Sequence, residues 1–488
     1  MTLPLLLDDA LSATVGGFSL RVSLPWIRSM PLASVTRVMV AIDKEPVAVS
    51  AALDGRAVTS AELATTPGWW FIQDRLELRG ERTLAPGTHD VSLSFTLLVP
   101  YLQAGPTGPL TLPFHAERPL VLGAPASGAT AAEGRASAGE SDAVAGVRPR
   151  SEEFASATVD DAWTVSASAF NWTPKVIRAQ RPAEDIAVGI VAEGIAETIE
   201  IEAGQVWRSF PNPSDAEVDR LGERLAAARG AVTIVGASLD DWALPSRRRT
   251  QEERLAFLVP QLRAAARLGA RGVRVPFGQA GPELLRLVQP VLEALDVVLY
   301  EEIQGQQTLG VPAVSTNLEL IQQLDDPRIR TLIDISMLMP SLPVSYLEEL
   351  RRGGVGEDLL VRLEHDWRAP ETHQAVVASL RGGQVPPAVH TLFMNLLVRF
   401  GRSEVGDLEP LLPLTGGVHL KFWDLEDTDG RVSRPISDIG AALRRTGFTG
   451  TLTSEWGGHE WLDDDPAATT RAHLALARRA LSTVSAPR

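Results

Sequence analysis

The sequence predicts an α/β protein in which a small antiparallel β-sandwich precedes a (β/α)8 TIM barrel. Three observations lead to this fold class. Short alternating runs of hydrophobic and polar residues occupy residues 17–122, small and polar residues dominate residues 123–156, and strands alternate with amphipathic helices in the remainder. We therefore expect a sandwich domain at residues 1–122, a flexible linker at residues 123–160 and a barrel at residues 161–488.

Hydrophobic and polar residues alternate in the N-terminal part of the chain, in runs separated by proline and glycine turns. The runs are FSLRVSL, RVMVAID, RLELRG and HDVSLSFTLLV. A period of two places successive side chains on opposite faces of a strand, so that one face can be buried while the other is solvated. The pattern predicts antiparallel sheets packed as a sandwich.

Alanine, glycine, serine, glutamate and arginine dominate the segment from Gly123 to Ser156, which has no aromatic residue before Phe154. Such a segment cannot bury enough apolar surface to offset the conformational entropy that ordering removes. The composition therefore predicts a flexible linker.

Eight candidate strands follow the linker, and leucines in the stretches between them recur at the spacings of three and four that an amphipathic helix requires. Because no GxGxxG turn follows the first strand, eight such units favour a closed barrel over an open doubly wound sheet. The longest excursion, about residues 340–415, should hold extra helices between the sixth and seventh strands. The strands are WTVSASAF (163–170), TIEIEA (198–203), AVTIVGAS (231–238), GVRVPFG (272–278), VVLYEEI (297–303), IRTLIDIS (329–336), GVHLKFW (417–423) and GTLTSEW (450–456).

Composition excludes several functional classes. The 488 residues carry a formal net charge of −15, which disfavours nucleic acid as a partner and with it DNA-repair endonuclease chemistry. The chain has no cysteine, which excludes disulfides, thiolate nucleophiles and cysteine-ligated zinc. No basic segment precedes the first apolar stretch and no run of about 18 apolar residues occurs, so we expect a cytoplasmic protein without a membrane partner. A homo-oligomer is compatible with these features.

Four late strands of the predicted barrel end on residues that can bind a metal ion. They are Glu302 on the fifth strand, Asp334 on the sixth, His419 on the seventh and Glu455 on the eighth. Polar residues at the C-terminal ends of barrel strands point into the active site. Three carboxylates and one imidazole suit Mn²⁺, Mg²⁺, Co²⁺ or Zn²⁺. Glu301 competes with Glu302, because adjacent strand residues point to opposite faces and periodicity alone does not decide between them.

Two further residues are candidates for acid/base or electrostatic roles. Lys421 follows His419 by two residues on the same strand face, so it can either stabilise negative charge on a substrate oxygen or form a salt bridge with a carboxylate ligand. His459 lies just beyond the eighth strand in SEWGGHEW, either as an active-site group or as a surface loop histidine. Aromatic residues after the strands, such as Phe170 and Phe210, would form a platform for a sugar ring or a flat aglycone.

Several motifs together resemble one family. SFPNPSD after the second strand, EEIQG at the fifth, LIDIS at the sixth, HLKFW at the seventh and TSEWGGH at the eighth resemble the sugar isomerase/epimerase superfamily of xylose-isomerase-like barrels. They resemble more closely the catalytic α-subunit of bacterial C-glycoside deglycosidases. GFSLRVSLPWIRSMPLASV, WWF and APGTHDVSLSF in the N-terminal part look like the small β-subunit of the same enzymes. The resemblance implies a fusion of the two subunits in the order β then α.

The resemblance also implies which residues hold the metal ion. It assigns Glu302 rather than Glu301, together with Asp334, His419 and Glu455, and it makes Mn²⁺ the expected ion. The family pattern has a histidine, a candidate base, two residues after the fifth-strand glutamate, whereas this chain has Gln304. A glutamine cannot accept a proton at neutral pH, so His459, Lys421 or a metal-bound water would have to supply acid/base chemistry. Gln304 itself remains a candidate catalytic-site residue.

The resemblance implies cleavage of a glycoside that a separate upstream oxidoreductase has oxidised to a ketone at sugar carbon three. The ketone acidifies the C2 hydrogen, a metal ion on the ketone oxygen stabilises the enolate, and the aglycone leaves from C1 by β-elimination, which makes the enzyme a carbon–carbon lyase when the link is a C-glycoside. The alternatives are a divalent-metal sugar isomerase or epimerase, and a catalytically impaired sugar-binding barrel.

Overall fold

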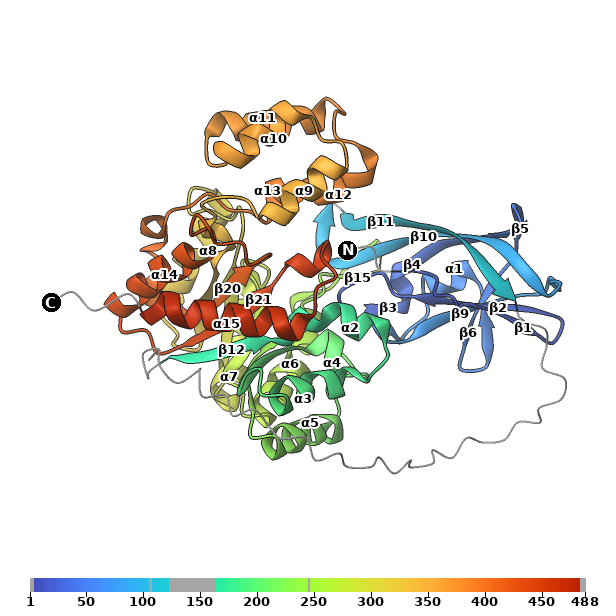
Figure 1. Ribbon diagram of the computed structural model, residues 1–488. Coiled ribbons are helices and arrows are strands. Elements are labelled where there is room, and N and C mark those ends of the chain that lie inside the picture. The colour runs from blue at the N-terminus through green and yellow to red at the C-terminus, as the bar shows by residue number, and fades with distance from the viewer. Residues whose placement is uncertain (1–3, 105–107, 123–162, 245, 483–488) are drawn as a thin grey trace, which may run out of the picture.

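The computed structural model describes residues 4–104, 108–122, 163–244 and 246–482, and shows two parts that lie side by side (Figure 1). The strand-rich N-terminal part is drawn in blue, and the barrel with its surrounding helices runs from green to red. The predicted linker lies outside the described residues. The boundaries of the domains remain a proposal.

Two larger antiparallel sheets and a two-stranded one form the N-terminal part, as the alternating runs predicted. Their inward side chains, among them Leu20, Leu78 and Leu93, are buried in one hydrophobic core. One sheet has the order β1 (Leu11–Thr14), β2 (Gly17–Ser23), β9 (Arg75–Gly80), β6 (Ser50–Leu53) and β7 (Arg56–Val58); the other has the order β11 (Gly108–Leu122), β10 (Gly87–Ala104), β4 (Val35–Ile42) and β5 (Glu45–Val47). Shorter elements are β3 (Met30–Pro31), α1 (Ser60–Leu63) and β8 (Trp69–Trp70).

Eight parallel strands close into a barrel in the C-terminal part, which confirms the predicted fold class. The ring closes through parallel pairing of the first and last strands. Each predicted strand corresponds to an observed one, with ends that differ by at most two residues. The strands are β12 (Thr164–Ser168), β13 (Thr198–Glu202), β14 (Ala231–Gly236), β17 (Gly272–Pro276), β18 (Val298–Ile303), β19 (Ile329–Asp334), β20 (Thr415–Phe422) and β21 (Thr451–Trp456).

Helices surround the barrel, and their ends carry the expected caps. The side chain of Ser214 accepts from the backbone of Glu217 at the start of α5, and Thr250 and Glu253 form the same capping box at α6. The helices around the strands are α2 (Thr173–Arg178), α3 (Ala183–Ala192), α4 (Ala203–Val206), α5 (Asp215–Ala227), α6 (Gln251–Arg267), α7 (Gly281–Leu295), α8 (Pro312–Leu324), α14 (Ser433–Arg445) and α15 (Pro466–Ser482), with a small hairpin of β15 (Trp242–Leu244) and β16 (Arg247–Arg248).

The predicted excursion between the sixth and seventh strands forms a group of helices at one end of the barrel (Figure 1). It has its own buried cluster, which includes Tyr346, Trp367 and Phe400 and extends to Trp423 just after β20. The excursion is therefore anchored to the rim of the barrel by aromatic packing. Its helices are α9 (Val344–Arg352), α10 (Glu357–His365), α11 (Pro370–Arg381), α12 (His390–Phe393) and α13 (Asn395–Val398).

The sandwich is in direct contact with the barrel. Arg28 of the sandwich donates to the carboxylate of Asp240, which follows β14, at 2.5 Å, and both side chains are buried. Trp69 packs edge-on against Phe210, which follows β13, with ring centroids 4.8 Å apart. The loops after β13 and β14 therefore carry the sandwich, at the end of the barrel where the strands finish.

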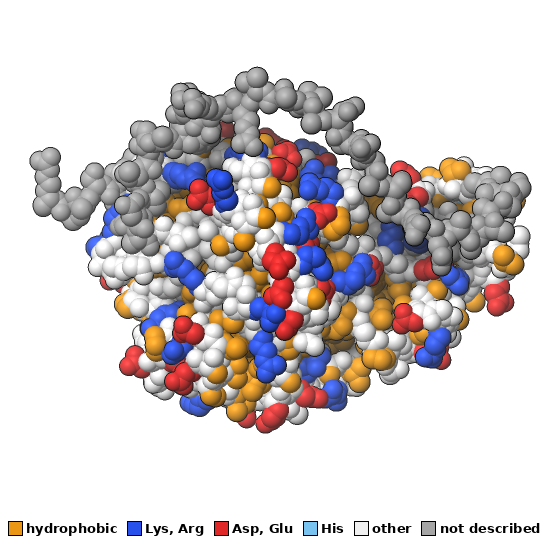
Figure 2. Space-filling model, turned by 90° about the horizontal axis from the view of Figure 1, so that it is seen from below, with side chains coloured by type: hydrophobic (Ala, Val, Ile, Leu, Met, Phe, Trp, Pro, Cys, Tyr) orange, Lys and Arg blue, Asp and Glu red, His pale blue; other side chains and the backbone are white. Residues whose placement is uncertain are grey.

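The surface of the barrel mixes charges of both signs. On the face shown in Figure 2, basic and acidic side chains alternate among the described residues. The outer helices carry ion pairs of this kind, such as Arg220 with Glu184 and Arg267 with Asp219. In the part of the chain that the structure describes, every helix is too short or too polar to cross a bilayer.

Candidate metal centre

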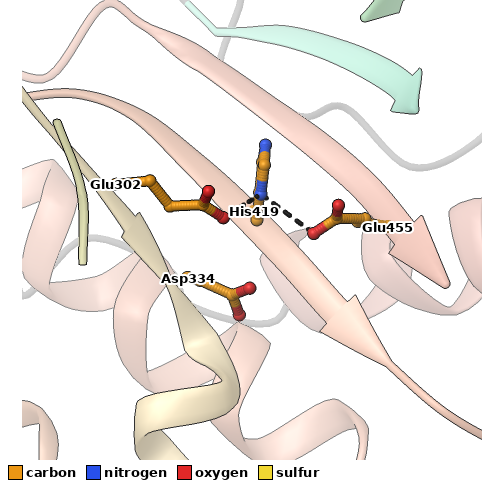
Figure 3. A group of neighbouring side chains, drawn as sticks. All are labelled: Glu302, Asp334, His419 and Glu455. Carbon is orange, nitrogen blue, oxygen red and sulfur yellow. Dashed lines mark hydrogen bonds and ion pairs between the residues drawn. The ribbon is translucent and has the colours of Figure 1, made fainter. Parts of the chain in front are cut away.

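The four predicted ligand residues lie together at the C-terminal end of the barrel strands. Glu302, Asp334, His419 and Glu455 come from β18, β19, β20 and β21, and each can offer an atom within 4.8 Å of the others. All four side chains are buried. Figure 3 shows the imidazole between the two glutamates, with the aspartate beside them. The group is therefore assembled by four neighbouring strands of one rigid barrel.

The structure separates Glu302 from its neighbour Glu301. Glu302 accepts from His419 inside the barrel, with Oε1 2.9 Å from Nδ1. Glu301 points to the other face of β18, where it accepts from the amide of Asn317 on α8 and from the backbone N–H of Gly278. Burial raises the pKa of Glu301 to about 7. Glu302, and not Glu301, therefore lies in the cluster.

His419 contacts carboxylates through both ring nitrogens. Nδ1 lies 2.9 Å from both Glu302 Oε1 and Glu455 Oε2, and Nε2 lies 3.0 Å from Glu200 Oε2. Burial alone would lower the pKa of His419, but the negative charges of Glu455, Glu200 and Glu302 outweigh burial and raise it well above the ordinary value. Without a metal ion the imidazole therefore holds a proton among the three carboxylates.

Glu200, Glu202 and Arg274 belong to the same buried network, and sequence reasoning missed all three. Arg274 on β17 donates through Nε to Glu200 at 2.7 Å and through Nη1 to Glu302 at 2.8 Å, and it also pairs with Glu202. Glu200 and Glu202 are two residues apart on β13, so their side chains lie on the same face of that strand. Two glutamates spaced by two on an early barrel strand were the available signal.

The donor set fits a hard divalent cation. Asp334 Oδ2 is buried and has no hydrogen-bond partner among the described residues. Burial raises the pKa of Asp334 to about 6, with further raising contributions from Glu455 and Glu302 that oppose Lys421. The cluster thus retains protons unless another cation neutralises it, and its oxygen-rich ligands match Mn²⁺, Mg²⁺ or Zn²⁺. The network around the cluster holds five carboxylates and two basic side chains, so acidic groups are in excess. The carboxylates are those of Glu200, Glu202, Glu302, Asp334 and Glu455, and the basic side chains are those of Arg274 and Lys421.

Lys421 reaches the cluster from β20. Its Nζ donates to Glu455 Oε2 at 3.0 Å and lies 5.6 Å from the ring centre of Phe170. Burial would lower the pKa of Lys421, but the charges of Glu455 and Asp334 outweigh it and raise the pKa. The lysine therefore stays charged, and it both pairs with a predicted ligand and lies over the ring of Phe170.

His459 is a buried residue, which decides against a surface loop position. It lies in η7 (Gly458–Glu460) after β21, with its ring centroid 5.0 Å from that of Phe170 and 5.6 Å from that of Trp456. Both ring nitrogens are buried without a hydrogen-bond partner in the described part of the chain. Burial, followed by the nearby charge of Lys421, lowers the pKa of His459 to about 3. The imidazole is therefore neutral at neutral pH.

The loop that carries His459 is fixed by the excursion. Trp461 donates its indole N–H to Ser345 Oγ at 3.0 Å and packs on Tyr346 of α9, and Arg399 pairs with Glu460. The contacts come from α9 and from Arg399 just after α13, so two separate parts of the excursion hold the loop in a defined position over the barrel.

Gln304, by contrast, is not part of the ion-pair network. It follows β18 by one residue and is half-buried, and its main-chain N–H donates to Gln307 Oε1 at 2.9 Å in a turn. The spacing of two from Glu302 places Gln304 at the barrel mouth. Its role remains a prediction, as do the roles of the other site residues.

The chain thus combines a (β/α)8 barrel, a buried carboxylate–imidazole centre and a docked sandwich. No protein-family model matches it. It is 28% identical over 317 residues to a C-glycoside deglycosidase alpha subunit from Arthrobacter globiformis, a match that covers 62% of this chain and 90% of the relative. It is 29% identical over 103 residues to a 3'-dehydrocarminate deglycosidase beta subunit from a Microbacterium species, covering 20% of this chain and 78% of that subunit. The resemblance to both subunits of C-glycoside deglycosidases is confirmed.

Among solved structures, the chain aligns with 3-keto-D-glucoside 4-epimerase from E. coli at a TM-score of 0.39 and 14% sequence identity. The alignment covers 65% of this chain and 99% of the epimerase. The barrel assignment for this chain rests on its own closed ring of eight strands.

Proposed function

We propose that the protein cleaves 3-oxo-glycosides by enolisation and β-elimination, with a divalent metal ion held by Glu302, Asp334, His419 and Glu455. The observation that carries the proposal is the buried cluster of these four side chains in a chain similar to deglycosidase alpha and beta subunits. The substrate would come from a separate oxidoreductase that makes the ketone at sugar carbon three.

A bound divalent ion, Mn²⁺ by preference, would act as a Lewis acid toward the ketone of the substrate. The surrounding residues exclude water from the site, because the four side chains of the cluster are buried. Arg274 donates to Glu302 and so holds this proposed ligand in position. Lys421 supplies a positive charge beside the proposed ligand Glu455, where it stabilises negative charge that develops on a substrate oxygen.

We assign the proton transfer to His459. Its neutral imidazole accepts the C2 proton while the C2–H electron pair forms the enolate. The enolate electrons then form the C1–C2 double bond as the bond from C1 to the aglycone breaks. The protonated imidazole then returns the proton to the departing aglycone. Atoms and charge balance over the two steps.

The second candidate is a metal-dependent sugar isomerase or epimerase, which forms the same enolate but leaves C1 bonded. Gln304 is the observation that favours it, since the deglycosidase pattern has a histidine at this position. A catalytically impaired sugar-binding barrel is the third, for the same reason.

One incubation series tests these candidates. The protein with Mn²⁺ is mixed with a C-linked 3-oxo-glycoside, an O-linked 3-oxo-glycoside or a free ketose, and released aglycone and new sugars are measured by chromatography. We expect aglycone release, faster from the O-linked substrate because its leaving group needs no ring protonation, and none from Asp334→Ala. Interconversion of free ketoses without aglycone release would establish the isomerase instead. Metal retention without turnover on any substrate would leave a sugar-binding barrel.

A further inference from the structure

We propose that Glu200 is a positioning residue that fixes the orientation and tautomer of His419 so that Nδ1 is free to bind the metal ion. This inference rests on the metal-binding part of the proposed function and does not depend on which sugar is the substrate. The two ring nitrogens of His419 face different partners. Nδ1 faces Glu302 and Glu455, which belong to the ligand group, whereas Nε2 faces Glu200, which does not.

The hydrogen-bond pattern determines the tautomer. A neutral imidazole carries one N–H, and an ionised carboxylate can only accept. When a metal ion takes the place of the proton on Nδ1, Glu200 Oε2, 3.0 Å from Nε2, accepts from the N–H that remains on Nε2. A carboxylate that accepts from the second nitrogen of a ligand histidine also increases the basicity of the ligating nitrogen.

Arg274 holds Glu200 in this position. Its Nε donates to Glu200 Oε1 at 2.7 Å, so that one carboxylate oxygen accepts from the arginine and the other faces His419. Glu200 is fully buried on β13, inside the closed barrel. The ion pair with the guanidinium of Arg274 suits an ionised carboxylate at Glu200, which can then only accept from His419.

Glu202 provides a matched control on the same strand. It pairs with the same arginine, Arg274, through Nη2, but it has no contact with His419. If Glu200 merely balanced the charge of Arg274, neutralising either glutamate should have a similar effect. If Glu200 positions His419, its own substitution should weaken the metal site much more.

Glu200→Gln is the decisive variant because it keeps the size of the side chain and leaves a single oxygen. Arg274 requires an acceptor, so the amide oxygen turns to the arginine and the NH₂ group faces His419 Nε2. Nε2 must then accept, the proton moves to Nδ1, and the ligand nitrogen is blocked. Glu202→Gln can keep its oxygen on Arg274 without presenting an N–H to the imidazole.

The test measures binding of Mn²⁺, Zn²⁺ and Mg²⁺ to the full-length protein by competition with a chelating dye, and circular dichroism checks the fold. We expect Glu200→Gln to bind Mn²⁺ roughly 10–100-fold more weakly than wild type, and Glu202→Gln, which removes a charge from the network without changing the partner of Nε2, to lose much less affinity. The loss should be larger for Zn²⁺, which favours imidazole, than for Mg²⁺, which relies on oxygen ligands. A purely structural role for Glu200 would not distinguish between these ions.

Three results would overturn the proposal. Equal Mn²⁺ affinity in wild type and Glu200→Gln overturns it while leaving the proposed function intact, and so does an equal loss in Glu202→Gln. A wild-type protein that binds no divalent ion overturns both this inference and the metal-binding part of the proposed function. If Glu200→Gln does not fold, Glu200→Asp takes its place: it keeps the charge but withdraws the carboxylate from Nε2, and it should weaken Mn²⁺ binding more than Glu202→Asp does.

Discussion

His459 has the least satisfied environment of the proposed site residues. An imidazole buried with both nitrogens unpartnered, as the described residues leave it, lowers the stability of the fold unless a ligand supplies the missing hydrogen bonds. A substrate that hydrogen-bonds to these nitrogens is the partner that the proposed function supplies. The chain has a useful contrast in His473, which is also buried with a pKa lowered to about 3 but contacts Ser454 Oγ at 2.8 Å through Nδ1.

We predict that His459→Ala lowers the rate of aglycone release by roughly 10²–10⁴-fold, which is typical for loss of a general acid/base group. Gln304→Ala should lower the rate only modestly, because its amide can position a substrate but cannot carry a proton. Steady-state kinetics on a 3-oxo-glycoside with Mn²⁺ measures both. A larger loss in Gln304→Ala than in His459→Ala would contradict the assignment of the proton carrier.

Gln304→His restores the residue that the deglycosidase pattern has at this position. We predict faster aglycone release from 3-oxo-C-glycosides in this variant, because the C-linked ring needs an additional proton donor when it leaves. Rates on C-linked and O-linked substrates are compared in the same assay. An unchanged rate on C-linked substrates would indicate that the natural substrate is O-linked or a free sugar.

The raised pKa of His419 gives a further prediction at the residue scale. Because this pKa lies well above the ordinary 6.5, the metal-free imidazole is protonated at pH 7, and binding of a metal ion must displace the proton. Mn²⁺ affinity should therefore fall as the pH falls, and calorimetry in buffers of different ionisation enthalpy should show proton release. A binding enthalpy that is independent of the buffer would contradict this expectation.

At the scale of single elements, strand parity explains what sequence reasoning could and could not predict. The eight strands were predictable because hydrophobic runs of five to eight residues alternate with helical periodicity. The choice between Glu301 and Glu302 needed the resemblance. Adjacent strand residues point to opposite faces, but the alternation alone does not tell which face points into the barrel. Glu200 was missed although Glu200 and Glu202 are spaced by two on β13, because that spacing is also common in surface ion pairs and does not identify a partner of His419.

The loop after β21 depends on the excursion for its position. Trp461→Phe removes the N–H that donates to Ser345 Oγ but keeps the ring packed on Tyr346. A neutral hydrogen bond contributes about 0.5–1.5 kcal/mol, so we predict up to roughly a tenfold loss of rate. Metal content should be unchanged, because the loop holds none of the four proposed ligands.

Ser345→Ala removes the same hydrogen bond from its other end. If the bond positions the loop, the effects of Trp461→Phe and Ser345→Ala on the rate should not add in the double variant. Additive losses, or full activity in both single variants, would show that this bond does not control the position of His459.

At the scale of the whole molecule, the contact between sandwich and barrel explains where two predicted aromatic residues belong. Phe210 was expected in a substrate platform, but it packs against Trp69 of the sandwich. Phe170 lies beside Lys421 and His459 as a platform residue would. Sequence alone could not separate the two, because both aromatic residues follow strands of the barrel and their partners are distant in the chain.

We predict that cleavage at a protease site introduced between Gly123 and Ser156 leaves the sandwich attached to the barrel. Arg28→Ala should weaken this attachment, because it leaves the buried Asp240 carboxylate without its partner, a change that typically costs ~3–5 kcal/mol. Arg79→Ala, which removes an exposed ion pair with Glu77, is the control and should have little effect. Size-exclusion chromatography of the cleaved protein compares the three. Separation of the two parts in the unsubstituted protein would contradict a stable contact.

Enolisation of a 3-oxo-glycoside by a metal-dependent site is the step on which the proposed function depends. The most direct test is exchange of the C2 hydrogen with solvent deuterium, followed by NMR or mass spectrometry of the sugar. With Mn²⁺ present, we predict that the wild-type protein catalyses C2 exchange or releases the aglycone from the exchanging substrate. Asp334→Ala and His419→Ala should lose the bound ion and the exchange together while keeping their circular dichroism spectra. No C2 exchange and no aglycone release by wild-type protein loaded with Mn²⁺ would contradict the account.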